Sequence, residues 1–113
     1  MKKLTIKKPW GQFEQFTHNE TTTVKIIFVN KKEAFSLQYH NNRTEFWHIL
    51  LGHPIVIIGE KTLLANPGDE FIIKNNQLHR LEAQNDDVQV LEITYGDFDE
   101  DDIIRTEDKY GRA

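Results

Sequence analysis

Four side chains near the middle of the chain have the types and the spacing of a metal site: Gln38, His40, Glu45 and His79. Two neutral imidazoles, a carboxylate and an amide oxygen together suit a borderline divalent ion such as Zn, Mn, Fe, Co or Ni. Because a glutamine carbonyl is a weaker ligand than histidine, such a site would keep positions open for water or substrate. The alternative is that His40 and His79 are ordinary hydrogen-bonded side chains.

Strand periodicity predicts that these side chains converge. Gln38 and His40 lie two residues apart, which places both on the same face of a strand. A turn over residues 41–44 would bring Glu45 beside His40, and His79 begins a later strand directly after another turn. Each candidate ligand therefore stands at the end of a strand, which is where we expect the mouth of a small barrel to hold a metal.

Short, closely spaced strands account for most of the chain. Runs rich in β-branched and aromatic residues, separated by turn residues, predict strands over residues 24–29, 34–40, 45–51, 55–58, 62–65, 70–74, 79–83 and 88–95. This spacing is typical of an all-β sandwich or barrel, since no convincing helical period interrupts it. The tail over residues 99–110 carries signals for a short helix.

Length and composition predict one domain over residues 1–113. The chain has 14 Lys and Arg against 18 Asp and Glu, 38% hydrophobic residues and no cysteine, which excludes disulfides, thiol catalysis and thiolate metal sites. The slight acidity argues against nucleic acid as a partner. No apolar run approaches the roughly 20 residues that span a bilayer, and the N-terminus lacks the apolar stretch of a signal peptide. We therefore expect a cytoplasmic protein with no membrane partner.

Five short motifs occur in order along the chain, at residues 8–13, 36–40, 43–47, 79–80 and 101–112. The segment around the candidate ligands, with Gly52 and the Pro67-Gly68 pair, resembles the two cupin motifs. Together the five motifs resemble the cupin domain of type II phosphomannose isomerases, in the mannose-6-phosphate isomerase and mannose-1-phosphate guanylyltransferase family. The resemblance implies a small cupin, a double-stranded β-helix or jelly-roll barrel, with an N-terminal arm and a short C-terminal tail.

The same resemblance implies a metal-dependent isomerase that interconverts mannose 6-phosphate and fructose 6-phosphate. It implies one divalent metal ion as cofactor, a small-molecule sugar phosphate as partner, and four metal ligands: Gln38, His40, Glu45 and His79. Arg43 and Arg105 match arginines of the family, and Lys25 matches a basic position.

Aldose–ketose isomerisation also needs a grip on the phosphate and a base for the carbon proton. The planar fork of an arginine suits phosphate, so Arg105 is our first candidate, Arg43 our second, and Lys25 a further substrate-binding residue. Arg43 could instead form a salt bridge on its hairpin, and Arg105 could pin the tail to the barrel. Glu92 is the candidate base if its strand face is internal, because burial would raise its pKa; otherwise it is solvated, and His48 is the other candidate.

Three segments depart from the family pattern. Lys31-Lys32 stands in place of a Pro-Gly pair, Asn41-Asn42 in place of a run of histidines, and residues 96–99 form a shorter loop without a tyrosine. The ligands survive these changes, whereas the substrate loop differs. Two alternatives therefore remain: a non-catalytic cupin that binds a sugar or sugar phosphate, and another metal-cupin enzyme acting on carbohydrate or as an oxygenase.

The edges of a small barrel also bear on assembly. Exposed strand edges are commonly paired across a two-fold axis, so we expect a homodimer. We expect Trp10 to anchor the N-terminal arm on a sheet, either of its own chain or of a partner subunit.

Overall fold

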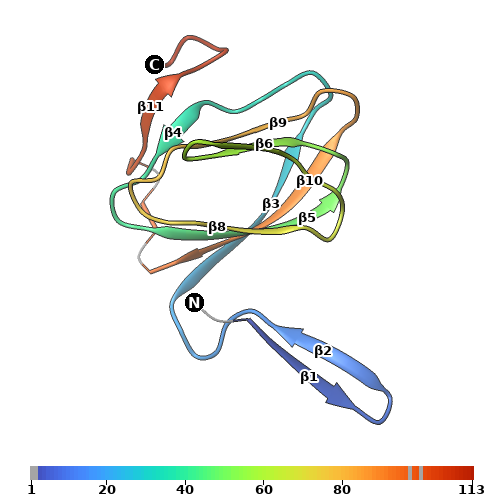
Figure 1. Cartoon of the computed structure of the whole chain (residues 1–113). Coiled ribbons are helices and arrows are strands. Elements are labelled where there is room, and N and C mark those ends of the chain that lie inside the picture. Colours follow the sequence, from blue (N-terminus) through green and yellow to red (C-terminus); the bar gives the residue numbers. More distant parts are fainter. Residues whose placement is uncertain (1–2, 97, 100) are drawn as a thin grey trace.

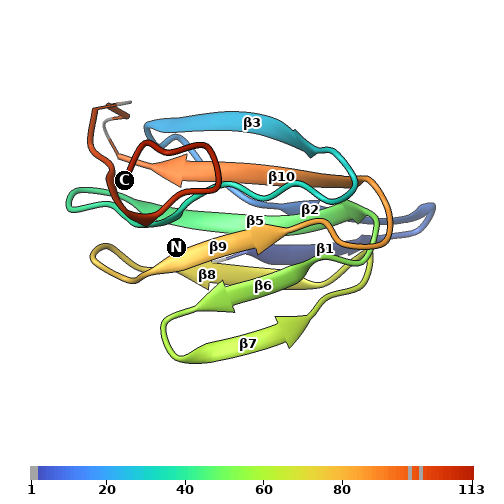
Figure 2. The same cartoon turned by 90° about the horizontal axis from the view of Figure 1, so that it is seen from above.

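Two antiparallel sheets face each other and form a small barrel (Figures 1 and 2). The computed structural model describes residues 3–96, 98–99 and 101–113, and within these residues every regular element is a strand. The first sheet contains, in spatial order, β3 (Thr22–Val29), β10 (Val88–Tyr95), β5 (Thr44–Leu51) and β8 (Glu70–Ile73). The second contains, in spatial order, β11 (Ile104–Glu107), β4 (Leu37–Tyr39), β9 (His79–Glu82), β6 (Ile55–Ile58) and β7 (Lys61–Leu64). The all-β barrel predicted from the sequence is confirmed.

The core fills the space between the sheets, because alternate residues of each strand point inward. Its fully buried members include Trp47, Ile49, Val56, Leu81, Val88 and Val90. Burying each such side chain contributes about 1.5–3 kcal/mol to folding. The same alternation places Phe46 and His48 of β5 on the outer face, so the inward row of β5 is Glu45, Trp47 and Ile49.

A separate hairpin forms the N-terminal arm. β1 (Leu4–Lys8) and β2 (Gly11–Gln15) pair only with each other, with Ile6 opposite Phe13. Figure 1 shows the hairpin leaving the barrel and extending away from it. An arm is expected from the resemblance, but its hairpin structure is not among the predicted strands.

The predicted helix over residues 99–110 is wrong. Residue 100 lies outside the described part, and the remainder contains β11, which pairs antiparallel with β4 and sets Arg105 opposite Gln38. The carboxylate of Asp99 accepts a hydrogen bond from the backbone nitrogen of Asp101 at 2.9 Å. This bond stabilises a turn, so Asp99 does not cap a helix. Pairing with the otherwise open edge of β4 outweighs the local helix signal, because it satisfies backbone groups on both strands.

Strand boundaries otherwise agree with the pattern to within a few residues, except for the predicted strand over residues 34–40. Only β4 is a strand there, and Ala34 contributes an isolated bridge to Glu82. Across the described residues we find no helix with the length and apolar character that crossing a bilayer would require.

Candidate metal centre

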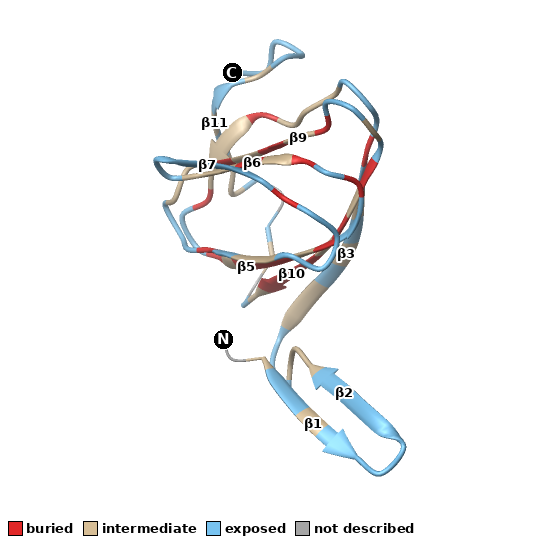
Figure 3. Cartoon of the chain, turned by 45° about the vertical axis from the view of Figure 1, so that its right-hand side comes forward, coloured by how far each residue is buried: buried red, intermediate tan, exposed pale blue. Residues whose placement is uncertain are grey.

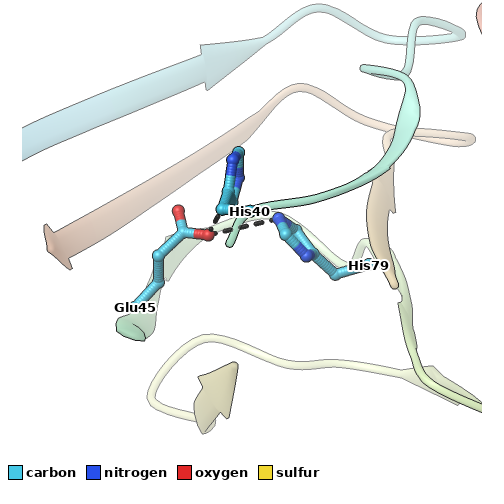
Figure 4. A group of neighbouring side chains, drawn as sticks. All are labelled: His40, Glu45 and His79. Carbon is cyan, nitrogen blue, oxygen red and sulfur yellow. Dashed lines mark ion pairs between the residues drawn. The ribbon is translucent and has the colours of Figure 1, made fainter. Parts of the chain in front are cut away.

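Three of the predicted ligands meet inside the barrel. Oε2 of Glu45 lies 3.3 Å from Nε2 of His40 and 3.2 Å from Nε2 of His79, and all three side chains are buried (Figure 4). Their candidate ligand atoms lie within 4.8 Å of one another. Three electron-pair donors at this separation form a group that can hold a metal ion.

Strand pairing brings these ligands together. β4 pairs with β9 through Gln38 opposite His79, and His40 follows directly after β4. Glu45 is the second residue of β5 and faces inward from the other sheet. The ligands thus come from both walls of the barrel, so the site depends on the two sheets packing in this register.

Backbone carbonyls fix the tautomer of both histidines. Nδ1 of His40 donates to the carbonyl oxygen of Asp102 at 2.6 Å, and Nδ1 of His79 donates to that of Gln77 at 2.9 Å. A carbonyl oxygen only accepts, so each neutral ring carries its proton on Nδ1 and its lone pair on Nε2. Both lone pairs therefore face Glu45, which is the tautomer that a metal requires.

The buried polar atoms fit a cation. Oε2 of Glu45 and Nε2 of His79 have no hydrogen-bond partner among the described residues, which is costly in a barrel interior. Burial alone would raise the pKa of the Glu45 carboxyl, but its contacts with His40 and then His79 lower it below its usual range. Neutral rings, by contrast, turn two lone pairs toward this carboxylate, so positive charge at the Nε2 positions is what keeps it ionised: an imidazolium supplies that charge, and a divalent ion would supply it to the neutral rings.

Gln38, the fourth predicted ligand, lies at the edge of this group. Its Nε2 is 3.4 Å from Nε2 of His40, and its Oε1 accepts a hydrogen bond from Oγ of Ser36 at 2.6 Å. Because a serine hydroxyl both donates and accepts, a half-turn of the amide would present the oxygen to the site without losing the bond to Ser36. The position therefore suits a fourth, weaker ligand.

Glu92 lies beside the ligands, on the inner face of β10. Register sets it between Lys25 of β3 and Trp47 of β5, and it is 5% exposed. Its burial, and then the negative charge of Glu45, raise its pKa to about 8, while Lys25 and Thr94 act in the opposite direction. The condition set for Glu92 as a base, an internal strand face, is thus met in the structure.

His48, the other candidate base, lies outside the site. It faces away from the barrel interior, and its Nδ1 contacts Oε2 of Glu70 at 2.6 Å. The structure thus leaves Glu92 as the titratable base candidate that is close to Glu45.

Arg43 points into the barrel mouth. It is 8% exposed, its Nη2 lies 2.9 Å from Nε2 of His40, and its Nε and Nη1 are buried without a partner among the described residues. The predicted alternative for Arg43, a surface salt bridge, does not occur among the ion pairs of the described residues. Its guanidinium also stacks on Phe98, with Cζ 4.7 Å from the ring centroid, and Lys25 lies over the same ring at 4.0 Å.

Arg105 comes from the opposite sheet. Because β11 pairs with β4 and β4 with β9, Arg105, Gln38 and His79 stand in one row across three strands. Nε of Arg105 is buried and has no partner among the described residues. Within the described residues, Nε and Nη1 of Arg43 and Nε of Arg105 thus have no acceptor.

A cavity of about 140 Å³ has Lys25, Gln38, Arg43, Glu45, Trp47 and Glu92 among its lining residues, and Arg105 is not one of them. It holds a carboxylate, a carboxyl with a raised pKa, and two cations in a buried setting. Asp102 and Phe98, which support His40 and Arg43, were not predicted from the sequence. Position within the motif at residues 101–112 was the available signal for Asp102, and position in the loop that departs from the family pattern, residues 96–99, was the available signal for Phe98.

Comparison with known proteins identifies relatives of the whole chain. The profile of the family described as mannose-6-phosphate isomerase C-terminal matches residues 1–108. Mannose-1-phosphate guanylyltransferase 2 of Escherichia coli O157:H7 is 34% identical over 107 residues, which cover 93% of this chain and 22% of that protein. The chain spans between 22% and 24% of the length of the relatives it matches.

Solved structures support the fold. The DMSP lyase DddQ of Ruegeria pomeroyi superposes with a TM-score of 0.69 at 16% identity, covering 80% of this chain and 46% of that one. A Klebsiella pneumoniae protein with a double-stranded β-helix domain gives a TM-score of 0.62 at 16% identity, covering 67% and 70%. The fold is therefore that of a cupin, and the chain belongs to the family of the mannose-6-phosphate isomerase C-terminal domain.

Proposed function

We propose that this chain is a metal-dependent isomerase that interconverts mannose 6-phosphate and fructose 6-phosphate. One observation carries the proposal: Glu45 of the buried His-Glu-His group lines a cavity together with a second carboxyl, Glu92, and two cations, Lys25 and Arg43. These are the parts that aldose–ketose isomerisation needs, namely a metal site, a base and a grip on phosphate. Family membership supports this choice of substrate class.

His40, Glu45 and His79 would hold the ion, with Gln38 as a fourth ligand. A divalent ion there supplies a Lewis acid for the substrate's carbonyl oxygen. Both imidazoles keep their orientation through the hydrogen bonds from Nδ1, so the ligand geometry is set before substrate arrives.

Glu92 is proposed as the base. Its carboxylate takes the proton from C2 of the aldose and returns it to C1 of the enediol, while a proton passes from the C2 hydroxyl to the former carbonyl oxygen. The two transfers leave the composition of the sugar unchanged, and the carboxylate of Glu92 is regenerated. Burial is the first cause that raises the pKa of Glu92, and a raised pKa makes a carboxylate a stronger base for abstraction of a carbon-bound proton.

Arg43 and Arg105 are proposed as the phosphate grip, with Lys25 beside them. Each of the two arginines has a buried guanidinium nitrogen without a partner in the part of the chain that the structure describes, and arginine pairs with phosphate through charge-assisted bonds. Lys25 and Arg43 both rest on the ring of Phe98, which holds these two cations close together at the cavity.

The test is to purify the protein without a polyhistidine tag, quantify its bound metals, strip it, and restore Zn, Mn, Co, Ni and Fe one at a time. Conversion of mannose 6-phosphate to fructose 6-phosphate is then measured for wild type, His79→Ala and His53→Ala. His53 is the matched control because it lies on the surface beside Asp86, outside the site. We expect metal-dependent turnover that His79→Ala loses and His53→Ala keeps.

A second candidate is a cupin that binds a sugar or sugar phosphate without turnover. It is favoured by relatives such as the mannose-1-phosphate guanylyltransferase 2 of Escherichia coli O157:H7, whose name gives guanylyltransfer and not isomerisation, and by the small share of their length that the chain covers. Bound metal without turnover under any of the five ions would reject the isomerase. Calorimetric binding of mannose 6-phosphate to that protein would then support the second candidate, and a protein that binds no metal would contradict both.

A further inference from the structure

Arg43 donates a hydrogen bond to the nitrogen of His40 that a metal ion would need. Its Nη2 lies 2.9 Å from Nε2 of His40, while Nδ1 of the same ring donates to the carbonyl oxygen of Asp102. A neutral imidazole has a single nitrogen lone pair, so Nε2 either accepts from Arg43 or binds an ion. The guanidinium and a metal therefore compete for His40.

The contact between Arg43 and His40 lies in the barrel interior. The two side chains are 8% and 2% exposed, and the strands β5, β9 and β10 contain buried stretches that enclose this interior (Figure 3). A hydrogen bond from a charged donor is stronger where water is excluded. An ion that takes the lone pair of His40 has to break this bond, which lowers the affinity of the site for metal.

A second contact lets the guanidinium leave His40 and stay in the site. Cζ of Arg43 lies 4.7 Å from the ring centroid of Phe98. The face of an aromatic ring attracts the charge of a cation as a whole, so the guanidinium can turn on Phe98 and keep this contact. Open space is present for such a turn, because Arg43 lines both the inner cavity and a pocket of about 310 Å³ that includes Asn41 and Asn42.

The other nitrogens of Arg43 indicate what a turned guanidinium would hold. Nε and Nη1 are buried and have no acceptor among the described residues. Nη2 belongs to both forked edges of a guanidinium, so its bond to His40 takes one N–H away from a fork that could bind an anion. A tetrahedral dianion such as phosphate or sulfate accepts bonds from a whole fork, and it therefore gains when Nη2 leaves His40.

We propose that Arg43 is a switch that makes metal and phosphate bind cooperatively. Its guanidinium bonds either His40 or the phosphate of the substrate, and the lone pair of His40 decides between the two. When that lone pair binds an ion, Arg43 loses its acceptor, turns on Phe98 and holds the phosphate. By linkage, an anion that draws Arg43 away from His40 raises metal affinity by the same factor. This inference rests on the proposed function, because it deepens the role of Arg43 in gripping phosphate.

The affinity for zinc in two matched variants is the first test. Arg43→Met keeps an unbranched side chain and removes the donor, so we expect it to bind zinc about 10- to 100-fold more tightly than wild type in competition with a chromophoric chelator. Lys25→Met is the control for charge, because Lys25 lies over the same ring of Phe98 at 4.0 Å. We expect a clearly smaller gain from that variant. Circular dichroism checks folding. Equal gains in both variants, or weaker binding by folded Arg43→Met, would overturn the proposal.

The second test measures the coupling in wild type, so it does not depend on the folding of a variant. Sulfate is a tetrahedral dianion with a soluble zinc salt, and calorimetry measures its binding to stripped and zinc-loaded protein at constant ionic strength. We expect zinc to raise sulfate affinity by about 5- to 150-fold, the usual range for coupled sites, and sulfate to raise zinc affinity by the same factor. Wild type that shows no such increase would contradict the switch.

Arg43→Met distinguishes the switch from direct binding of the anion to the ion. Without the guanidinium, we expect sulfate affinity to be the same in the stripped and the zinc-loaded variant. An increase that persists in Arg43→Met would mean that sulfate ligates the zinc, which would also reject the proposal. None of these measurements contains a sugar, so they give a result whether or not the protein converts mannose 6-phosphate.

Discussion

Glu92 and Glu45 are two buried carboxyls held close together in one cavity. Burial and then the charge of Glu45 raise the pKa of Glu92 to about 8, whereas Glu45, despite its burial, is kept ionised by His40 and His79. Between the ordinary glutamate pKa of 4.5 and the raised value, the folded protein binds more protons than the unfolded chain. The free energy of unfolding therefore falls as the pH rises through that window.

Glu92→Gln tests this residue in two ways. The amide stays neutral and can still donate to Glu45, so in the metal-free protein we expect the variant to lose most of the pH-dependent fall in stability. Without the carboxylate, we expect kcat of the metal-loaded enzyme to drop by about 10²- to 10⁴-fold, the usual contribution of a general base. Urea unfolding between about pH 4.5 and about pH 8 and the isomerase assay measure the two effects. Unchanged kcat would remove Glu92 from the mechanism.

Asp102 supports the metal site from outside it. Its carbonyl accepts from His40, and its carboxylate accepts from the backbone nitrogens of Asn41 and Asn42 at 2.8 and 3.0 Å. We expect Asp102→Ala to loosen this clamp and weaken metal affinity by about 10- to 100-fold, as is typical when a group that orients a ligand is lost. Competition with a chromophoric chelator measures the affinity. Asp86→Ala is the control, because Asp86 bonds a backbone nitrogen far from the site, and equal losses in both variants would contradict the role of Asp102.

At the scale of the elements, the turn between β5 and β6 has no room for a side chain. Gly52 has φ +86°, and a Cβ there would lie 2.3 Å from the carbonyl oxygen of Asp87. The turn is closed by the loop before β10, which fixes β5 and hence Glu45 against the neighbouring strand. A larger residue would therefore act on the site through the register of the sheet.

Gly52→Ala and Gly68→Ala form a matched pair. Gly68 also has positive φ, +93°, but open space surrounds its Cβ position. We expect Gly68→Ala to lower the free energy of unfolding by about 1–3 kcal/mol through backbone strain alone. Gly52→Ala should lower it further, because the backbone must also move. Urea unfolding of both variants gives the comparison. If both variants lose the same free energy of unfolding, the close contact between a Cβ at position 52 and the carbonyl oxygen of Asp87 does not destabilise the protein, which would contradict the prediction.

The barrel strands follow from sequence because their pattern is local. Runs of β-branched and aromatic residues between strong turns predict β5, β6 and β10 closely, and the period of two correctly places Gln38 and His40 on one face. The helix signal over residues 99–110 failed because β11 depends on pairing with β4, a contact between distant parts of the chain.

The site was partly predictable for the same reason. The local pattern of a strand, a turn and a second strand predicts that the ligands converge. Whether the side chain of Glu92 is buried depends instead on which face of β10 is internal. That face is set by the register with Lys25 and Trp47, which no local pattern reveals. The arm hairpin was missed because its strands bury little and its Pro9-Trp10 turn gives no strand signal.

At the scale of the whole molecule, the first sheet carries the acidic residues of the candidate site on its inner face and exposed apolar side chains on its outer face. Glu45 and Glu92 point into the barrel, and Val24, Ile26 and Phe28 point out of it. The metal ligands come from both sheets, so an ion would join the two halves of the fold. Binding to the folded state alone stabilises it by RT ln(1 + [L]/Kd), which is about 2.7 kcal/mol at a hundredfold excess over Kd.

Metal binding should therefore raise the thermal midpoint of the folded protein, and the increase should depend on the buried ligands. We expect added divalent metal to raise Tm in wild type and in His53→Ala, because His53 lies on the surface beside Asp86, and to leave Tm unchanged in His79→Ala. Calorimetry of the three proteins, stripped and then loaded, measures the effect. A metal-dependent shift that persists in His79→Ala would place the ion elsewhere, and one that disappears in His53→Ala would show that binding depends on the surface histidine.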